Sequence, residues 1–405
     1  MESANNTVPP PEPNQPPQPF WERLRRFFTN QPLQTAPSAD NVRNTVSPIR
    51  LLIDRYWYRR HCPYCFGFVT KQVYRERSRQ GSVASTISTA PSSIRIYQCP
   101  NCAAELPSDF FASRSSCIAL VGGTESGKST FITVLCELLM NRHTILSELG
   151  ISGSIINIDG REQFEENRQR LIEQEMALNL TTTMPHPTVL CLHSTQHQKV
   201  TYLTLLDSPG EYFTRMETLR TRHPNLQHAT GIVFLMNPLD TVELVRMIRK
   251  ESPGIISSNR PITARNYDII ENLYKLYLEG RRTKPNRAIK TPSAFCLSRA
   301  DLLENITNLY APPDFEPDLI DVEDILEETD LVAQDLRELL EDVDLNLINN
   351  MDKRFSNYSI FPVSALGQMP SSDAMGQRIP GGINPRGVLQ PIIWLLRETK
   401  FISQP

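Results

Sequence analysis

The sequence lacks the features that would assign the chain to a membrane or to an export route. None of its apolar runs approaches the roughly 18 uninterrupted residues that a membrane-spanning helix needs. The amino terminus is rich in proline and polar residues, and it has neither the basic start nor the apolar core of a signal peptide. We therefore expect a cytoplasmic protein.

An excess of charge of one sign is also missing, because 42 Lys and Arg residues are balanced by 45 Asp and Glu residues, which leaves a formal net charge of -3. This balance gives no global signature of nucleic-acid binding, although a local basic face is compatible with it. With 405 residues, of which 40% are hydrophobic, the chain can bury a large core together with a smaller accessory module.

Cysteines are few for a disulfide framework, and four of the eight form two pairs, Cys62-Pro-Tyr-Cys65 and Cys99-Pro-Asn-Cys102. Four thiolates in two such turns suit a tetrahedral zinc ion that is structural, because no coordination position stays open for chemistry. The spacing between the pairs exceeds the usual value of about 15 to 20 residues. The excess falls in the Ser- and Arg-rich stretch 75–93, which we expect to be a flexible insert in a zinc ribbon over 55–108.

Other interpretations of this region stay open. A redox dithiol competes with the metal site, and His61 is either an additional ligand or, as we expect, a surface neighbour. The runs 66–70 and 93–97 are expected to be the short strands of the ribbon. Nucleic-acid contact through the insert is a weaker hypothesis, which rests on the local positive charge of Lys71, Arg75, Arg77, Arg79 and Arg95.

Residues 1–48 form an arm rich in Pro, Asn and Gln that is expected to be disordered, because it has too little apolar surface to offset the entropy of ordering. One amphipathic island, residues 20–28, interrupts it with aromatic residues beside arginines. The island either packs on the protein's own surface or contacts a partner or an anionic membrane surface.

The stretch Gly122–Ser129 reads GGTESGKS and matches the phosphate-loop pattern G-x-x-x-x-G-K-[ST]. The apolar β-type run 117–121 precedes it, and helical apolar spacing over 130–140 follows it, so the loop joins a strand to a helix in an α/β domain. Lys128 is expected to reach phosphate oxygens and Ser129 to bind Mg²⁺, whereas a chance glycine-rich turn is the alternative. The expected nucleotide contacts here are Gly122, Gly123, Thr124, Glu125, Ser126, Gly127, Lys128, Ser129 and Thr130.

Two later segments have the form of nucleotide switches. Residues 181–188 are rich in threonine and precede a strand, and we favour Thr183 or Thr188 as the residue that meets Mg²⁺ and the γ-phosphate, unless all are plain loop residues. The buried run 200–206 ends at Asp207-Ser-Pro-Gly210, a D-x-x-G motif. Asp207 is expected to hold Mg²⁺ through water, and the Gly210 N–H to sense the γ-phosphate.

Two further motifs follow apolar strands near the end of the chain. Residues 298–301 read SRAD and stand where a guanine-reading [NT]-K-x-D motif is expected, with Ser298 in place of Asn or Thr and Arg299 in place of Lys. Asp301 would accept hydrogen bonds from the guanine edge. The residues Ser364, Ala365 and Leu366 resemble the loop whose backbone meets the guanine O6.

Between these motifs, residues 312–352 are rich in Asp and Glu with Leu and Ile at helical spacing. We expect an acidic helical excursion whose charge is a solvated face or, less favoured, a docking surface for a basic partner. Residues 386–397 are expected to be a final amphipathic helix on the sheet.

These five motifs in order resemble the TRAFAC class of P-loop GTPases over a domain of about 115–402. The preceding four-cysteine pattern and the terminal helix are similar to zinc-ribbon proteins of the double-GTPase type from bacterial signalling or defence systems. The resemblance implies a mostly parallel sheet flanked by helices, GTP and GDP binding with Mg²⁺, slow hydrolysis, and a protein partner that reads or activates the switch. Glu211 stands where Ras-like members carry a water-orienting Gln, so it is a further catalytic candidate and predicts slow turnover.

The sequence thus favours a GTP-binding and GTP-hydrolysing molecular switch. One alternative is an ATPase with the same phosphate loop. The other is a nucleotide-bound scaffold that scarcely hydrolyses and that acts through the ribbon and the amino-terminal arm.

Overall fold

The structure is a computed structural model, and the chain divides into two compact units, residues 1–54 and 55–405. Every described residue lies in the second unit. The expected disordered arm 1–48 and its island 20–28 lie outside the described residues. The structure describes residues 61–69, 73–77, 94–108, 110–111, 117–141, 146, 149–179, 187–194, 199–205, 209–223, 226–254, 265–281, 287–304, 306–307, 311, 314, 322–373 and 376–402.

The centre of the domain is a parallel sheet of four strands in the order β3-β7-β8-β9. Side chains along these strands are almost entirely buried, as in parallel sheets that are covered on both faces. The strands are β3 (Ile118–Gly122), β7 (Gly231–Met236), β8 (Ser293–Leu297) and β9 (Tyr358–Pro362).

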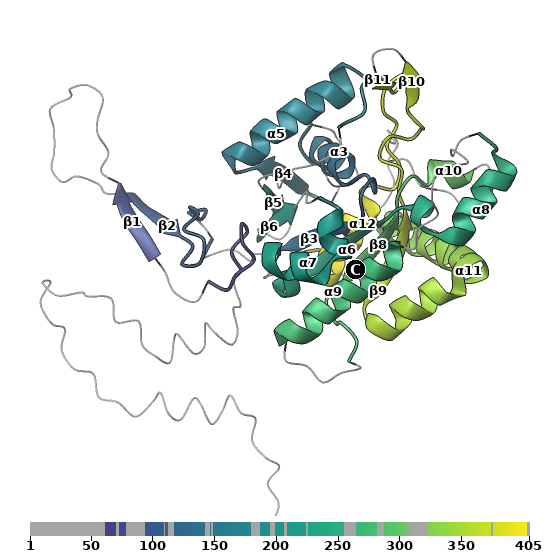
Figure 1. Cartoon of the computed structure of the whole chain (residues 1–405). Helices are drawn as coiled ribbons and strands as arrows, with labels where there is room; N and C mark the ends of the chain where they lie inside the picture. The colour runs from purple at the N-terminus through teal and green to yellow at the C-terminus, as the bar shows by residue number, and fades with distance from the viewer. Residues whose placement is uncertain are drawn as a thin grey trace, which may run out of the picture. The chain divides into compact units, whose positions relative to one another are not determined.

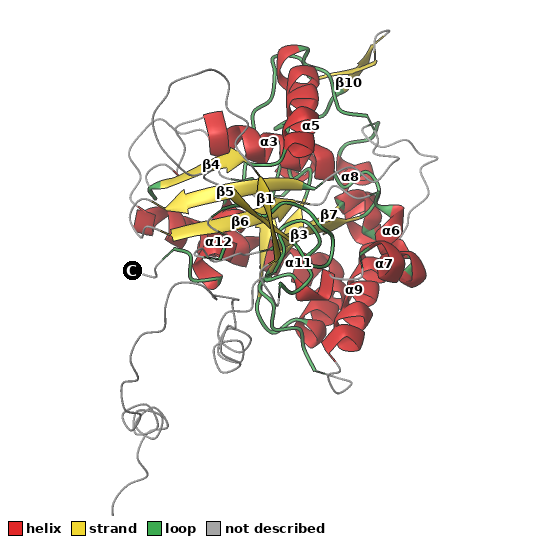
Figure 2. Ribbon diagram, turned by 90° about the vertical axis from the view of Figure 1, so that its left-hand side faces the viewer, coloured by secondary structure: helices red, strands yellow, loops and turns green. Residues whose placement is uncertain are grey.

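Three antiparallel strands extend this architecture, and β6 packs beside β3. They are β4 (Ile151–Ile155), β5 (Thr188–Ser194) and β6 (Lys199–Leu205). Figure 2 shows the strands in yellow between red helices. The expected α/β fold with a mostly parallel sheet and flanking helices is therefore confirmed.

Helices cover both faces of the parallel sheet. Alternation along β3 divides its side chains, since Ile118 and Leu120 pack into one core with α3 and α12, whereas Ala119 and Val121 pack into the other with α8, α9 and α11. The helices are α3 (Lys128–Asn141), α5 (Ile158–Arg168) with a π-helical turn (Gln169–Glu173), α6 (Glu211–Thr214), α7 (Met216–Arg222), α8 (Val242–Glu251), α9 (Arg265–Arg281), α10 (Asp301–Glu304), α11 (Val322–Arg354) and α12 (Gln390–Glu398), with 3-10 turns at Leu226–His228 and Pro238–Asp240.

The acidic segment is not the excursion that its composition indicates. Its helix α11 turns an apolar stripe inward, and this stripe belongs to the second core: Leu336, Leu340, Leu347, Ile348 and Met351. The charged residues occupy the outer side of the helix, in agreement with the solvated face that we favoured. The helical spacing of Leu and Ile was thus the better guide to the position of this segment than its charge.

A kink divides α11 at Asp344, whose φ of -145° and ψ of 66° are not helical. The Asp344 carboxylate accepts a hydrogen bond from the Leu347 N–H (3.1 Å) and another from the Tyr267 hydroxyl of α9. This side chain therefore caps the second half of the helix and ties it to α9.

Small hairpins complete the described chain. In the ribbon, β1 (Val73–Arg77) pairs with β2 (Ile94–Gln98), both visible in Figure 1. The second strand agrees with the expected run 93–97, whereas the first begins later than 66–70 because residues 62–67 are folded into the cysteine turn. Since β1 reaches Arg77, the first residues of the insert expected to be flexible are paired, and 78–93 lie outside the described residues.

A second hairpin, β10 (Ser371–Asp373) with β11 (Gly376–Arg378), follows the last motif. Backbone hydrogen bonds join this hairpin to residues 175–177, which precede the Thr-rich stretch. The Ala177 N–H donates to the Gln377 carbonyl oxygen (2.9 Å), and the Ile379 N–H donates to the Glu175 carbonyl oxygen (2.8 Å). Among the described residues, no helix is long and apolar enough to cross a membrane.

The packing of α11 can be tested with two leucines on that helix. Leu340 is completely buried and Leu331 is 62% exposed. We expect Leu340→Ala to lower the free energy of unfolding by about 2 to 5 kcal/mol, because it leaves a cavity in the second core. Leu331→Ala should change it by less than about 0.5 kcal/mol. Urea denaturation measures both, and equal losses would contradict the described orientation of the helix.

Candidate nucleotide site and four-cysteine cluster

The phosphate loop, residues 122–129, connects β3 to α3 as its motif requires. Gly127 has a φ of +84°, in the left-handed region that favours glycine. A Cβ on Gly122 would lie 2.6 Å from the Ser126 Oγ and 2.8 Å from the Leu235 carbonyl oxygen, so only glycine fits there. The chain is therefore built to turn sharply at both ends of this loop.

The Lys128 side chain bonds back to the first residues of this loop. Its side chain is buried, and its ammonium group donates hydrogen bonds to the carbonyl oxygens of Gly122 (3.0 Å) and Gly123 (2.7 Å). The positive charge is thus fixed at the centre of the loop, beside the amino terminus of α3, where a phosphate group would be attracted. Ser129 lies in the first turn of this helix, with its carbonyl oxygen bonded to Thr133.

Gly210 of the D-x-x-G motif packs directly against the phosphate loop. A Cβ at this position would lie 2.0 Å from the backbone nitrogen of Thr124 and 2.2 Å from the carbonyl carbon of Gly123. The structure therefore brings together two motifs that are more than eighty residues apart in the sequence. Glu211 follows as the exposed first residue of α6, and Asp207 lies outside the described residues.

The two candidate switch threonines differ in what the structure describes. Thr188 is the first residue of β5, pairs with Leu205 and is buried. Thr183 lies outside the described residues.

The two motifs that were expected to read the base meet at the carboxyl ends of β8 and β9. Asp301 begins α10, and its carboxylate accepts a hydrogen bond from the Ser364 hydroxyl at 2.5 Å. The same serine oxygen accepts the Gly367 N–H (3.0 Å). Ser298 is held differently, because its backbone N–H and its hydroxyl both donate to the carbonyl oxygen of Met236 (2.9 and 3.0 Å).

The remaining residues of these motifs are partly accessible. Arg299 is half-buried and has a φ of +53°. Ala365 and Leu366 are half-buried beside the first core. Arg386 also links the two motifs. It forms a salt bridge of 2.6 Å with Glu304, which ends α10, and it donates a hydrogen bond to the Gly367 carbonyl oxygen (3.1 Å) in the loop after Ser364.

Asn237 is a supporting residue that the sequence interpretation missed. It is completely buried directly after β7, and its amide donates to the carbonyl oxygen of Glu125 in the phosphate loop (3.3 Å). Its side-chain oxygen accepts the Leu239 N–H (3.0 Å), and its carbonyl oxygen accepts the amide of the buried Asn266 (3.1 Å). A polar residue directly after an apolar run of six residues was the signal that could have indicated this role.

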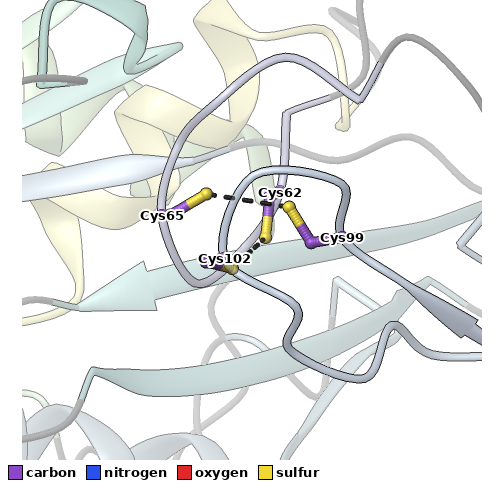
Figure 3. A group of neighbouring side chains, drawn as sticks. All are labelled: Cys62, Cys65, Cys99 and Cys102. Atoms are coloured by element: carbon purple, nitrogen blue, oxygen red, sulfur yellow. Dashed lines mark hydrogen bonds between the residues drawn. The ribbon is translucent and has the colours of Figure 1, made fainter.

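The four paired cysteines form one cluster in which all the sulfur atoms lie within 4.8 Å of one another. The sulfur atoms of Cys62 and Cys102, and those of Cys65 and Cys99, are 3.8 Å apart and face a common centre in Figure 3. Four sulfur ligands at about 2.3 Å from a tetrahedral zinc ion are about 3.8 Å apart. The cluster therefore fits the ion that its sequence pattern predicts.

The two cysteine turns have matching backbones. Phe66 and Ala103, which follow the second cysteine of each turn, have φ values of 56° and 59°. The N–H groups of Tyr64 and Asn101 each point at the sulfur of the first cysteine at 3.4 Å. Such donors stabilise negative charge on sulfur, as metal binding requires.

Hydrogen bonds among the four thiols also shift their pKa values. The bond with Cys62 contributes most to lowering the pKa of Cys102 to about 7, and the bond with Cys102 holds the pKa of Cys99 far below its ordinary value. The pKa of Cys62 is raised by the bond with Cys102, by its other thiol neighbours and by burial.

His61 is not the surface neighbour that we expected. It is buried, its Nδ1 lies 3.1 Å from the Phe66 carbonyl oxygen, and it is not part of the cluster of four sulfurs.

One comparison with known proteins, the match to a family model, agrees with this arrangement. Residues 116–254, about a third of the chain, match the family model Double-GTPase 2. A search of curated proteins found no match. Solved structures that resemble the chain include the Arl6 BBS3 small GTPase of Trypanosoma brucei with bound GppNp, at 13% identity and a TM-score of 0.31, covering 71% of this chain and 99% of that one.

The GTP-bound GTPase-like domain of Ski7 from S. cerevisiae is similar at 15% identity and a TM-score of 0.34, with 73% of this chain and 53% of that one covered. The bacterial selenocysteine-specific elongation factor EF-Sec matches at 15% identity and a TM-score of 0.25, over 70% of this chain and 29% of that one.

The parallel sheet, the phosphate loop and the D-x-x-G glycine packed on that loop define a P-loop GTPase domain. The match of residues 116–254 to the Double-GTPase 2 model supports a domain of the double-GTPase type.

The metal content of the cluster is directly testable. We expect one zinc ion per purified chain, and a loss of most of it in Cys102→Ser, because three thiolates bind zinc less tightly than four. Cys296→Ala is the matched control, since this buried cysteine lies in β8 and is no part of the cluster. Elemental analysis measures the zinc. An equal zinc content in all three proteins would contradict the assignment of the ligands.

Proposed function

We propose that the chain is a GTP-binding and GTP-hydrolysing molecular switch that depends on Mg²⁺. The observation that carries the proposal is the hydrogen bond between Asp301 and Ser364, which joins the two base-reading motifs at the carboxyl ends of adjacent parallel strands. Ligands of open α/β sheets bind at this edge, and the phosphate loop leaves β3 at the same edge. A carboxylate fixed there can accept from the N1–H and N2–H₂ groups of guanine, which adenine does not present.

At the phosphate end, Lys128 neutralises phosphate charge and Ser129 binds Mg²⁺. Asp207 completes this role through water, and the Gly210 N–H senses the γ-phosphate. The support for these roles is the buried ammonium group inside the loop and the contact between Gly210 and the loop backbone. A switch residue must move between nucleotide states, so Thr183 is a better candidate than Thr188, which is paired within β5.

Hydrolysis in this proposal is slow without a partner. Water attacks the γ-phosphate, and catalysis consists of positioning and charge stabilisation. Glu211 is the residue after Gly210, and a carboxylate near the γ-phosphate repels it and cannot donate a hydrogen bond to it. An activating protein would therefore position the water, in the kind of signalling or defence role that the double-GTPase resemblance implies. The four-cysteine cluster holds a structural zinc ion in the same chain.

The base preference is tested by Asp301→Asn. We expect the affinity for GTP to fall by about 10- to 100-fold, because hydrogen bonds to a charged group are lost, while the affinity for xanthosine triphosphate rises. Calorimetric titration with GTP, xanthosine triphosphate and ATP measures this change. Asp335→Asn on the exposed side of α11 is the control and should bind GTP as the parent does. Tighter binding of ATP than of GTP by the parent would instead support an ATPase.

The contact of Gly210 with the loop is tested by Gly210→Ala. The added methyl group cannot fit against Thr124, so the segment must move away from the loop. We expect single-turnover phosphate release from GTP to slow by about 100-fold, the loss typical of a displacement of about 1 Å in an active site. Glu217→Ala, an exposed change in α7, should release phosphate at the parent rate. Tight GTP binding with no phosphate release by the parent, with or without partners, would favour a scaffold.

A further inference from the structure

The first cysteine turn of the ribbon, Cys62–Cys65, lies against the strand that leads into the phosphate loop. The carbonyl oxygen of Cys62 accepts a hydrogen bond from the thiol of Cys117 (3.6 Å), a completely buried residue directly before β3. The carbonyl oxygen of Cys117 in turn accepts the Thr230 N–H (2.8 Å) at the start of β7. The turn therefore touches the start of β3, and Cys117 links that point to the start of β7.

The same turn is bonded to the strand that leads into the D-x-x-G motif. The Thr204 hydroxyl on β6 donates to the carbonyl oxygen of Pro63, and Thr204 is completely buried. Thr204 is the last residue but one of β6, which ends at Leu205, two positions before Asp207 begins the motif. Both hydrogen bonds, from Cys117 and from Thr204, end on backbone carbonyls of the turn that carries the first two cysteine ligands.

A third contact joins the ribbon to the segment that follows Gly210. Residues 211–228 comprise α6, α7 and a 3-10 turn that ends at His228. The His228 ring lies 4.5 Å from that of Phe68 and 5.9 Å from that of His61, as measured between ring centroids. The segment expected to move with the nucleotide is thus anchored to the ribbon at its far end.

Apolar packing continues the same interface. Ribbon residues share one buried cluster with side chains of β5 and β6, and its members are Cys62, Cys99, Leu106, Phe110, Cys191 and Tyr202. Two of the four clustered cysteines, Cys62 and Cys99, are therefore part of the small core that packs on β5 and β6.

We propose that the metal in the four-cysteine cluster and the nucleotide are thermodynamically coupled ligands, with the turn Cys62–Cys65 as the positioning element between them. This inference rests on the proposed nucleotide binding. Without a metal, four thiols no longer hold the two cysteine turns together, and the Pro63 carbonyl leaves Thr204 with an unpaired buried hydroxyl. The start of β3 and the end of β6 then lose their support, so the phosphate loop and the D-x-x-G segment that these strands carry are less well placed for nucleotide.

Coupling of this kind is reciprocal, because metal must raise nucleotide affinity by the same factor by which nucleotide raises metal affinity. The full-length chain provides both measurements. We expect a fluorescent GDP analogue to bind about 5- to 150-fold more weakly to chelator-stripped protein than to zinc-loaded protein. We also expect saturating GDP to slow the transfer of zinc from loaded protein to a chromogenic chelator.

A matched pair of variants on β6 tests the positioning element while zinc stays bound. Thr204→Val removes the donor to Pro63 with little change in shape, and Thr201→Val removes a buried hydroxyl that has no hydrogen-bond partner among the described residues. With one zinc per chain in both variants, Thr204→Val should bind the GDP analogue several-fold more weakly and lose most of the protection of zinc by GDP. Thr201→Val should behave as the parent.

The outcomes separate the two proposals. If loaded protein binds GDP with the same affinity as stripped protein, and GDP leaves zinc transfer unchanged, the coupling is refuted and the proposed function stands. If loaded protein binds neither GDP nor GTP, the proposed function is refuted and the coupling with it. Should stripped protein lose its fold, as circular dichroism would show, zinc transfer from loaded protein with and without GDP decides the question alone.

Discussion

Burial of β3 on both faces is the constraint on which the rest of the domain depends. Its side chains alternate between two cores, so the strand cannot shift by one residue without exchanging the two sets. This fixed register determines where the chain emerges at Gly122 and where α3 begins at Lys128. The sheet fixes the first residue of the phosphate loop, and Asn237 donates a hydrogen bond to the Glu125 carbonyl oxygen within it. The geometry of the loop is therefore set before a nucleotide binds.

Much of the site could be predicted from the sequence, because its parts are local motifs whose spacing already specifies their chemistry. The phosphate loop between strand and helix and the cluster of four cysteines follow from short patterns, whereas the hydrogen bond between Asp301 and Ser364 was not predicted. The contact of Gly210 with Thr124 and the network around Asn237 could not be predicted, since they depend on how distant strands align. The helix α11 and its solvated charged face were predicted, but its packing into the second core was not, because the spacing of its leucines does not say which surface they cover.

Two opposite charges at the phosphate end of the site fit the proposed switch better than a rapid hydrolase. The ammonium of Lys128 is buried and held by two carbonyl oxygens, which favours tight retention of phosphate. Glu211 begins the neighbouring helix with a carboxylate that carries charge of the same sign as the nucleotide. In the proposed function, a site that attracts the nucleotide strongly and positions water poorly stays mostly in the bound state.

The ribbon also has a consequence for the order in which the chain can fold. Pro63 and Thr204, which hydrogen-bond to each other, are 141 positions apart in the sequence. During synthesis the ribbon leaves the ribosome before β5 and β6. Its apolar side chains are covered only after those two strands have been made. Leu106 and Phe110 therefore stay exposed on the nascent chain until the strands that carry Cys191 and Tyr202 have been translated.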